Sequence, residues 1–256
     1  MPEMRNEAPN GMDIGAFVRR VVRGFGKDEH FGVNVIFCPG MGNGHRHNQN
    51  VWYIWRLLGM QYDNWTRFGN GGQDYMDYVE GTGGRELLGG TPLLKEEKLC
   101  ELCELIKGQC VEKPVVLIGF SAGAYLCMRA AIRMKEAKLP LILLCFGHTL
   151  MVSDLWQEVV EHVPGVIMFG EREMSMDIYV NDIGSVDLSD LAHGPDADEV
   201  STVHFGSYAG SQAQCARVSR TFPRCMVLVA EDCGHNLGHY KSAIKYGKVR
   251  ALTPPF

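Results

Sequence analysis

Short aliphatic runs recur along the chain, separated by longer stretches in which apolar residues follow helical spacing. The runs are too short for helices and are bounded by Gly or Pro, so they predict strands at 33–38, 115–118, 139–146, 166–169 and 225–230. The stretches between them predict helices at 50–58, 91–107, 124–135, 153–162 and 212–222. This alternation is typical of an α/β protein in which helices cover both faces of a mostly parallel sheet.

Three segments lack such a pattern. Residues 1–13 are polar and are expected to form a loose N-terminal arm. Residues 59–90, rich in Gly, Asp and aromatic residues, are expected to be irregular apart from one short strand near 75–79. The acidic stretch 174–200 is expected to be an insertion or lid, followed by a further strand at 201–205. Because there is no internal repeat and no linker-like stretch, residues 1–256 are expected to form a single domain.

The most informative motif is Gly119-Phe120-Ser121-Ala122-Gly123, which lies between a predicted strand and a predicted helix. A serine at such a sharp turn is pushed clear of the sheet, and glycines two residues before and after it allow the strand and helix to approach closely. The helix N-terminus also brings backbone N–H groups to the place where an oxyanion would form. Ser121 is therefore the candidate nucleophile. The alternative is a serine that only caps the helix.

A serine nucleophile needs a general base, and His235 is the best candidate because it follows the last predicted strand on a loop containing Gly234. For the carboxylate that orients this histidine, the sequence favours Glu173, three residues beyond the end of the strand at 166–169 and its glycine. Other carboxylates in the same part of the chain remain alternatives: Asp177, Glu171 and Asp154.

The loop after the first predicted strand is rich in glycine, from Gly40 to Gly44. We expect the backbone N–H groups of Met41 and Ala122 to form an oxyanion hole. The loop lacks the Lys-Ser/Thr ending of a P-loop, and its glycine spacing differs from that of a dinucleotide site, so no cofactor is expected.

Each of three other groups of residues allows two functional interpretations. His45 and His47 could ligate zinc with Cys38 or a distant histidine, but polar residues at the mouth of a cleft are the preferred interpretation, and no metal is expected. Cys100 and Cys103 have the spacing of a redox pair, yet they lie in a predicted amphipathic helix and are interpreted as core thiols. The aromatic residues that follow the glycine loop either wall an acyl pocket or pack a helix onto the sheet: Trp52, Tyr53, Trp55, Trp65 and Phe68.

Composition narrows the possible partners and location. The net charge is −5, from 25 basic and 30 acidic side chains with no strongly basic stripe, which argues against a nucleic-acid partner. The chain has no apolar run of about 18 residues, so no membrane span is expected. An odd number of cysteines, 9, without a signal-peptide core favours free thiols and a cytoplasmic location. The sequence does not indicate an oligomeric state.

The order of a glycine-rich loop, G-x-S-x-G and Gly234-His235-Asn236 resembles the α/β-hydrolase superfamily over most of the chain. The resemblance implies the α/β-hydrolase fold and acyl-transfer chemistry using Ser, His and Asp or Glu. A fainter similarity is to an uncharacterised hydrolase branch that includes bacterial phospholipase effectors. It is carried by Phe37 to Gly44, Asn50-Val51, Glu80 to Gly83 and Gly119 to Tyr125. This chain has Pro39, Ala122 and His148 where that branch has Asp, Arg and Asp.

Together, these features predict a serine hydrolase that cleaves an ester or thioester of a small-molecule or lipid-like acyl substrate through an acyl-enzyme. Carboxylesterases, lipases and thioesterases work in this way. Two alternatives stay open. One is a module of the same fold that binds a ligand or partner without cleaving it. The other is a non-hydrolytic acyltransferase or lyase that uses the same residues.

Overall fold

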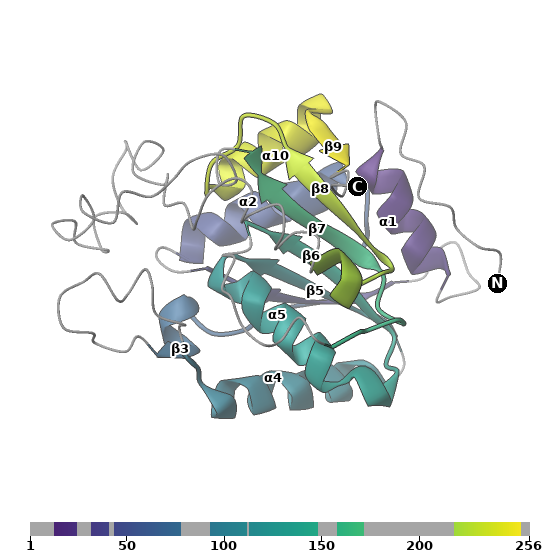
Figure 1. Ribbon diagram of the computed structural model, residues 1–256, viewed down its shortest axis with the longest axis vertical. Helices are drawn as coiled ribbons and strands as arrows, with labels where there is room; N and C mark the ends of the chain where they lie inside the picture. The colour runs from purple at the N-terminus through teal and green to yellow at the C-terminus, as the bar shows by residue number, and fades with distance from the viewer. Residues whose placement is uncertain are drawn as a thin grey trace, which may run out of the picture.

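The computed structural model describes residues 13–24, 32–40, 44–77, 93–111, 113–147, 158–171 and 218–251. Figure 1 shows how these elements are arranged. The helices are α1 (Ile14–Arg23), α2 (Gly44–Leu57), α4 (Glu96–Gln109), α5 (Ala122–Arg133) and α10 (Leu237–Tyr246), with short 3-10 helices η1 (Gly72–Asp74) and η2 (Lys135–Ala137). The strands are β1 (Asn34–Cys38), β2 (Asn64–Arg67), β3 (Met76–Asp77), β4 (Leu93–Leu94), β5 (Val115–Phe120), β6 (Leu141–Phe146), β7 (Gly165–Gly170), β8 (Cys225–Ala230) and β9 (Val249–Ala251).

Seven of these strands form one sheet in the order β2-β1-β5-β6-β7-β8-β9. Every neighbouring pair is parallel except β8 and β9, which are antiparallel. The small strands β3 and β4 pair separately, also antiparallel. Because the central strands run in the same direction, the loops that follow β1, β5 and β8 all leave from one edge of the sheet.

Helices cover both faces of the sheet, as the sequence predicts (Figure 1). Successive residues of β5 point to opposite faces of the sheet. Leu117 packs with the apolar residues of α4 and α5, whereas Ile118 packs with those of α1, α2 and α10. All six residues of β5 are buried, as expected for a parallel strand with helices on each side. This layered, mostly parallel sheet is the α/β-hydrolase fold, so the predicted fold class is confirmed.

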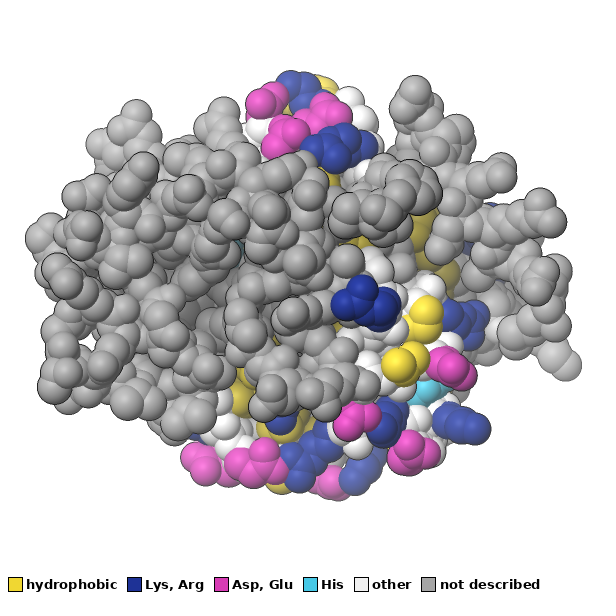
Figure 2. Space-filling model, viewed as in Figure 1, with side chains coloured by type: hydrophobic (Ala, Val, Ile, Leu, Met, Phe, Trp, Pro, Cys, Tyr) yellow, Lys and Arg dark blue, Asp and Glu magenta, His cyan; other side chains and the backbone are white. Residues whose placement is uncertain are grey.

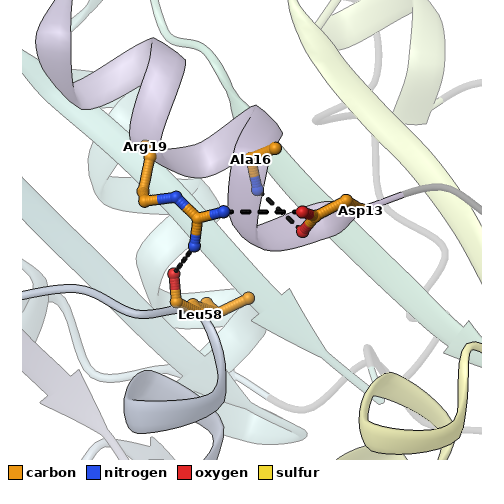
Figure 3. A network of polar contacts seen from close by, with 4 residues as sticks. All are labelled: Asp13, Ala16, Arg19 and Leu58. Carbon is orange, nitrogen blue, oxygen red and sulfur yellow. Dashed lines mark hydrogen bonds and ion pairs between the residues drawn. The ribbon is translucent and has the colours of Figure 1, made fainter.

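Helix α1 was not predicted, and its N-terminal region is fixed by the polar network drawn in Figure 3. Asp13 caps the helix, because its carboxylate accepts a hydrogen bond of 2.9 Å from the Ala16 N–H. Arg19 donates to the Leu58 carbonyl, just beyond the end of α2, and also pairs with Asp13 at 3.4 Å. The network therefore ties α1 to the C-terminal end of α2.

Several boundaries differ from the prediction. The helix predicted from residue 91 begins at Glu96, because Leu94 belongs to a strand that pairs with Met76. The helix predicted over 153–162 is wrong for residues 158–162, which are not helical. Helix α2 begins six residues earlier than expected, and the last helix and the edge strands are not among the predicted elements: α10, β2 and β9.

Other expectations lie outside the described residues: the arm up to residue 12, the insertion at 174–200 and the strand at 201–205. In the part of the chain that the structure describes, no helix combines the length and the apolar character needed to span a membrane.

Candidate active site

Ser121 occupies the turn between the end of β5 and the start of α5, in an unusual backbone conformation with φ 54° and ψ −121°. Such a conformation costs a non-glycine residue on the order of 1–3 kcal/mol, so the surrounding structure must hold it in place. Its N–H donates to the Phe146 carbonyl at 3.0 Å, and its carbonyl accepts from the Ala124 N–H at 3.0 Å. The side chain makes no capping bond to α5, which rules out the interpretation of Ser121 as a helix cap.

The two glycines of the motif are required by close backbone contacts. A Cβ atom on Gly119 would lie 2.5 Å from the Cα atom of Ala124 in α5. A Cβ atom on Gly123 would lie only 1.9 Å from the carbonyl oxygen of Cys38. The first glycine therefore lets the strand approach the helix, as predicted. The second lets the helix approach the end of β1, which the sequence analysis did not foresee.

His235 lies beside the serine, with its Nε2 atom 2.8 Å from the Ser121 Oγ atom. This distance is within the range needed for a side chain to take a proton directly from a hydroxyl. The imidazole also stacks on the Phe120 ring, with centroids 5.1 Å apart and planes 29° apart. The structure therefore brings together two residues that are 114 positions apart in the sequence.

The loop that carries His235 is fixed at several points. Asp232 adopts φ 57°, so the chain turns sharply as it leaves β8. The Gly234 N–H donates to the Nδ1 atom of His239, in the first turn of α10, at 3.3 Å. Asn236 caps the same helix by accepting a bond of 2.7 Å from the Gly238 N–H. These contacts hold the residues on both sides of His235.

Glu171, one of the alternative carboxylates, contacts this loop from the end of β7. Its carboxylate accepts a bond of 3.1 Å from the Asp232 N–H and forms an ion pair of 3.1 Å with Arg250 in β9. The backbone hydrogen bond from Asp232, followed by the bond from Arg250, lowers the pKa of the Glu171 carboxyl below its ordinary value. Glu171 is therefore an anion that anchors the loop three residues before His235.

The predicted acid, Glu173, lies outside the described residues, as do the alternatives Asp154 and Asp177. The identity of the carboxylate that orients His235 therefore stays a prediction.

Of the two N–H groups expected to form the oxyanion hole, the structure describes only that of Ala122. Ala122 is the first residue of α5, where a backbone N–H has no partner within the helix and lies at the positive end of the helix dipole. Gly40 packs directly against the serine, because a Cβ atom placed there would lie 2.8 Å from the Ser121 Cβ atom. The Gly40 carbonyl accepts a bond of 3.0 Å from the Gly72 N–H. Met41 lies outside the described residues.

For the two cysteines of α4, the structure supports one interpretation as a core thiol and contradicts the other. Cys103 is buried in α4, as interpreted, and burial raises the pKa of its thiol. Cys100 is exposed, so it is not a core thiol. No group of three or more His, Cys, Asp or Glu side chains could hold a metal ion among the residues described, and the side chains of His45 and His47 are not among them.

The aromatic cluster divides in two. Trp55 is buried and packs edge-on against Trp65 with centroids 6.1 Å apart, so these rings attach α2 to the sheet. Trp52 and Tyr53 point outwards and are exposed. Neither of the two predicted roles therefore describes this exposed pair.

The sequence assigns no role at the site to three residues that the structure places there: Phe120, Asn236 and His239. Asn236 could have been found, because Asn followed by an amphipathic segment is a common helix start. Phe120 and His239 carry no such signal, since their roles depend on how β5 and α10 approach the histidine loop.

No family model matches the chain, and no curated protein matches it. A solved structure similar to it is that of a proposed hydrolase of the alpha/beta superfamily from Xanthomonas campestris pv. campestris. The identity is 19% and the TM-score 0.41, over 84% of this chain and 95% of that one. The sheet order and helix layers of the chain itself are those of the α/β-hydrolase fold.

Proposed function

We propose that this protein is a serine hydrolase that cleaves an ester or thioester through an acyl-enzyme intermediate. The observation that supports the proposal most strongly is the 2.8 Å contact between Ser121 Oγ and His235 Nε2, made while Ser121 is in its strained turn conformation. A serine that only fills space gains nothing from such strain, whereas a nucleophile is exposed by it at the end of the strand.

In the first half of the proposed reaction, the Ser121 oxygen forms a bond to the carbonyl carbon of the substrate. Its proton passes to His235 Nε2, and the carbonyl oxygen becomes an oxyanion. The N–H groups of Ala122 and Met41 stabilise this charge, helped by the dipole of α5. The bond to the leaving alcohol or thiol then breaks, and His235 returns the proton to the leaving group.

In the second half, a water molecule attacks the acyl carbon and gives one proton to His235. The bond between Ser121 and the acyl group breaks, the proton returns to the serine oxygen, and the carboxylic acid leaves. Glu173 orients the imidazole and stabilises its protonated form throughout. The substrate that this chemistry suits is a small-molecule or lipid-like acyl compound.

A fluorophosphonate probe tests the proposal, because it bonds covalently to an activated serine. We expect the wild-type protein to be labelled at Ser121, and Ser121→Ala to lose the label completely. Ser242→Ala is the matched control, since Ser242 is an exposed serine of α10 and should leave labelling unchanged.

Labelling should also fall at least a hundredfold in His235→Ala, because the general base is gone. A folded wild-type protein that is not labelled would refute the proposal. That result would favour the alternative of a binding module that holds a ligand without cleaving it.

A further inference from the structure

Helix α2 presents an exposed stripe of aromatic and apolar side chains on the side away from the sheet. Trp52, Tyr53 and Leu57 are 38%, 50% and 42% exposed, whereas Val51 and Ile54 on the opposite side are buried. Tyr53 and Leu57 are neighbours at i and i+4 on the helix, and the Trp52 ring contacts the Tyr53 ring, so the three exposed side chains form a continuous surface. Large exposed apolar side chains grouped in this way mark a contact surface.

Basic side chains cover the rings of this stripe. The Arg56 guanidinium lies 4.8 Å from the Trp52 ring centroid, and Lys241 of α10 lies 5.3 Å from that of Tyr53. The Trp52 and Tyr53 rings are themselves in edge contact, with centroids 5.4 Å apart. The four side chains therefore form one connected row that crosses from α2 to α10.

Helix α10 extends the row with the same chemistry. One turn beyond Lys241, Lys245 lies 5.0 Å from the ring centroid of Tyr246, which is 66% exposed. We call these residues the aromatic-basic patch: Trp52, Tyr53, Arg56, Leu57, Lys241, Lys245 and Tyr246. None of its three cations forms an ion pair with an acidic residue of the described chain.

The charge of the patch contrasts with that of α4. Residues 33–62 and 233–256 contain no Asp or Glu, although the whole chain has a net charge of −5. Along α4, by comparison, Lys98 pairs with Glu101 and Lys107 with Glu104, both at 2.6 Å. Acidic and basic side chains lie next to one another along the lower border of Figure 2, where α4 lies in the same view of Figure 1. Helices α2 and α10 themselves thus carry basic side chains and no acidic ones.

We propose that the aromatic-basic patch docks the protein on an anionic lipid surface. Trp and Tyr rings with one apolar side and one polar atom favour the headgroup level of a bilayer. Lysine and arginine beside them attract anionic headgroups, and their aliphatic stems can lie along the rings. The three cations of the patch are spread over two helices beside exposed rings and are not gathered at one point, which suits a surface of many anionic headgroups better than a single charged group of a protein partner.

The two helices that carry the patch begin close to the Ser–His pair. Helix α10 begins two residues after His235, and α2 begins four residues after Gly40. Both helices therefore lead from the patch back to the edge of the sheet where Ser121 lies. The docking itself does not depend on hydrolysis, so it can be measured in Ser121→Ala as well as in the wild-type protein.

The test is sedimentation of the full chain with phosphatidylcholine vesicles that contain about a third phosphatidylserine, compared with pure phosphatidylcholine. We expect binding to the anionic vesicles, weaker binding to the neutral ones, and loss of binding as salt is raised. Replacing Lys241 and Lys245 together by Gln should weaken binding about 25-fold, at roughly fivefold for each cation. Trp52→Ala should weaken it further.

The matched control is Lys98→Gln with Lys107→Gln on α4, which removes the same charge from the other face and should leave binding unchanged. If the Lys241 variant does not fold, Arg56→Gln with Lys245→Gln changes only exposed cations of the patch. The proposal is overturned if the wild-type protein ignores anionic vesicles. It is also overturned if the patch and control variants bind equally well, or if binding requires an added protein.

Discussion

The tightest contact at the Ser121 turn makes Gly123→Ala the most informative substitution. The new Cβ atom would lie 1.9 Å from the Cys38 carbonyl oxygen, 2.5 Å from its carbon and 2.8 Å from the Pro39 oxygen. Ordinary contacts of a Cβ atom begin at 3.4 Å, so α5 and the end of β1 would have to separate by about 1.5 Å. All three atoms belong to the backbone, so no side-chain rotation can relieve the clash.

The end of β1 cannot move freely. Cys38 is paired in the ladder with Gly119 of β5, and β1 also pairs with β2 on its other side. Overpacking a rigid core costs about 1–3 kcal/mol or more, and we expect a loss of at least about 3 kcal/mol here. For a protein of this size, that corresponds to a fall in Tm of about 6–12 °C. Because Gly40 follows two residues after Cys38 and packs on Ser121, probe labelling should fall about 100-fold as well.

Gly108→Ala is the matched control, because nothing lies within 4 Å of a Cβ atom placed at this position in α4. Alanine in place of glycine inside a helix should stabilise the protein by about 0.5–1 kcal/mol. Guanidinium unfolding followed by circular dichroism measures both variants, and the fluorophosphonate reaction measures the site. The reasoning is refuted if Gly123→Ala unfolds within about 0.5 kcal/mol of the wild type.

Three further substitutions test the histidine loop and the thiols. Glu171→Gln removes the ion pair with Arg250, so probe labelling should slow several-fold. Because the pKa of the Glu171 carboxyl lies below its ordinary value of 4.5, wild-type stability should fall as the pH drops below that value. Thermal melts from pH 3 to 6 should show a shallower fall in the variant, and identical profiles would contradict this. Cys100→Ser should remove one thiol that reacts rapidly with Ellman's reagent at pH 8, whereas Cys110→Ser should remove none, because burial raises the pKa of Cys110 to about 11. Equal counts in both variants would contradict the assignment.

The central strands were predictable because their side chains are buried on both sides. β5, β6 and β8 are continuous runs without a charged or polar side chain for this reason. The edge strands β2 and β9 gave no such signal, since each is short and partly exposed. Their strand conformation depends on pairing with a neighbour.

One helix-start signal in the sequence predicts the wrong structure, and another is correct but is missing from the predicted elements. Thr91-Pro92 has the pattern of a helix start, yet pairing between β3 and β4 holds Leu93–Leu94 in a strand instead. Asp13 before an amphipathic run is a clear N-terminal signal for α1 that the sequence analysis did not use.

The contact between Ser121 and His235 was predictable in outline, because each follows a buried strand at the same edge of the sheet. The stacking of Phe120 on His235 and the outward direction of Trp52 were not. Both depend on how one element rotates against another, which residue spacing alone does not specify. The acid could not be chosen from the sequence either, because three carboxylates follow β7 within seven residues and Asp154 follows β6.

The strands β5 and β8, which lead to Ser121 and His235, are separated in the sheet by β6 and β7. Three inter-strand steps of about 4.8 Å place their axes roughly 14 Å apart, so the 2.8 Å contact exists only when all four strands are assembled. A ribosome that is making this chain must finish β8 before the pair can form. Labelling of the proposed nucleophile Ser121 would then report on folding, because its contact with His235 forms only once β8 has joined β5 in the sheet.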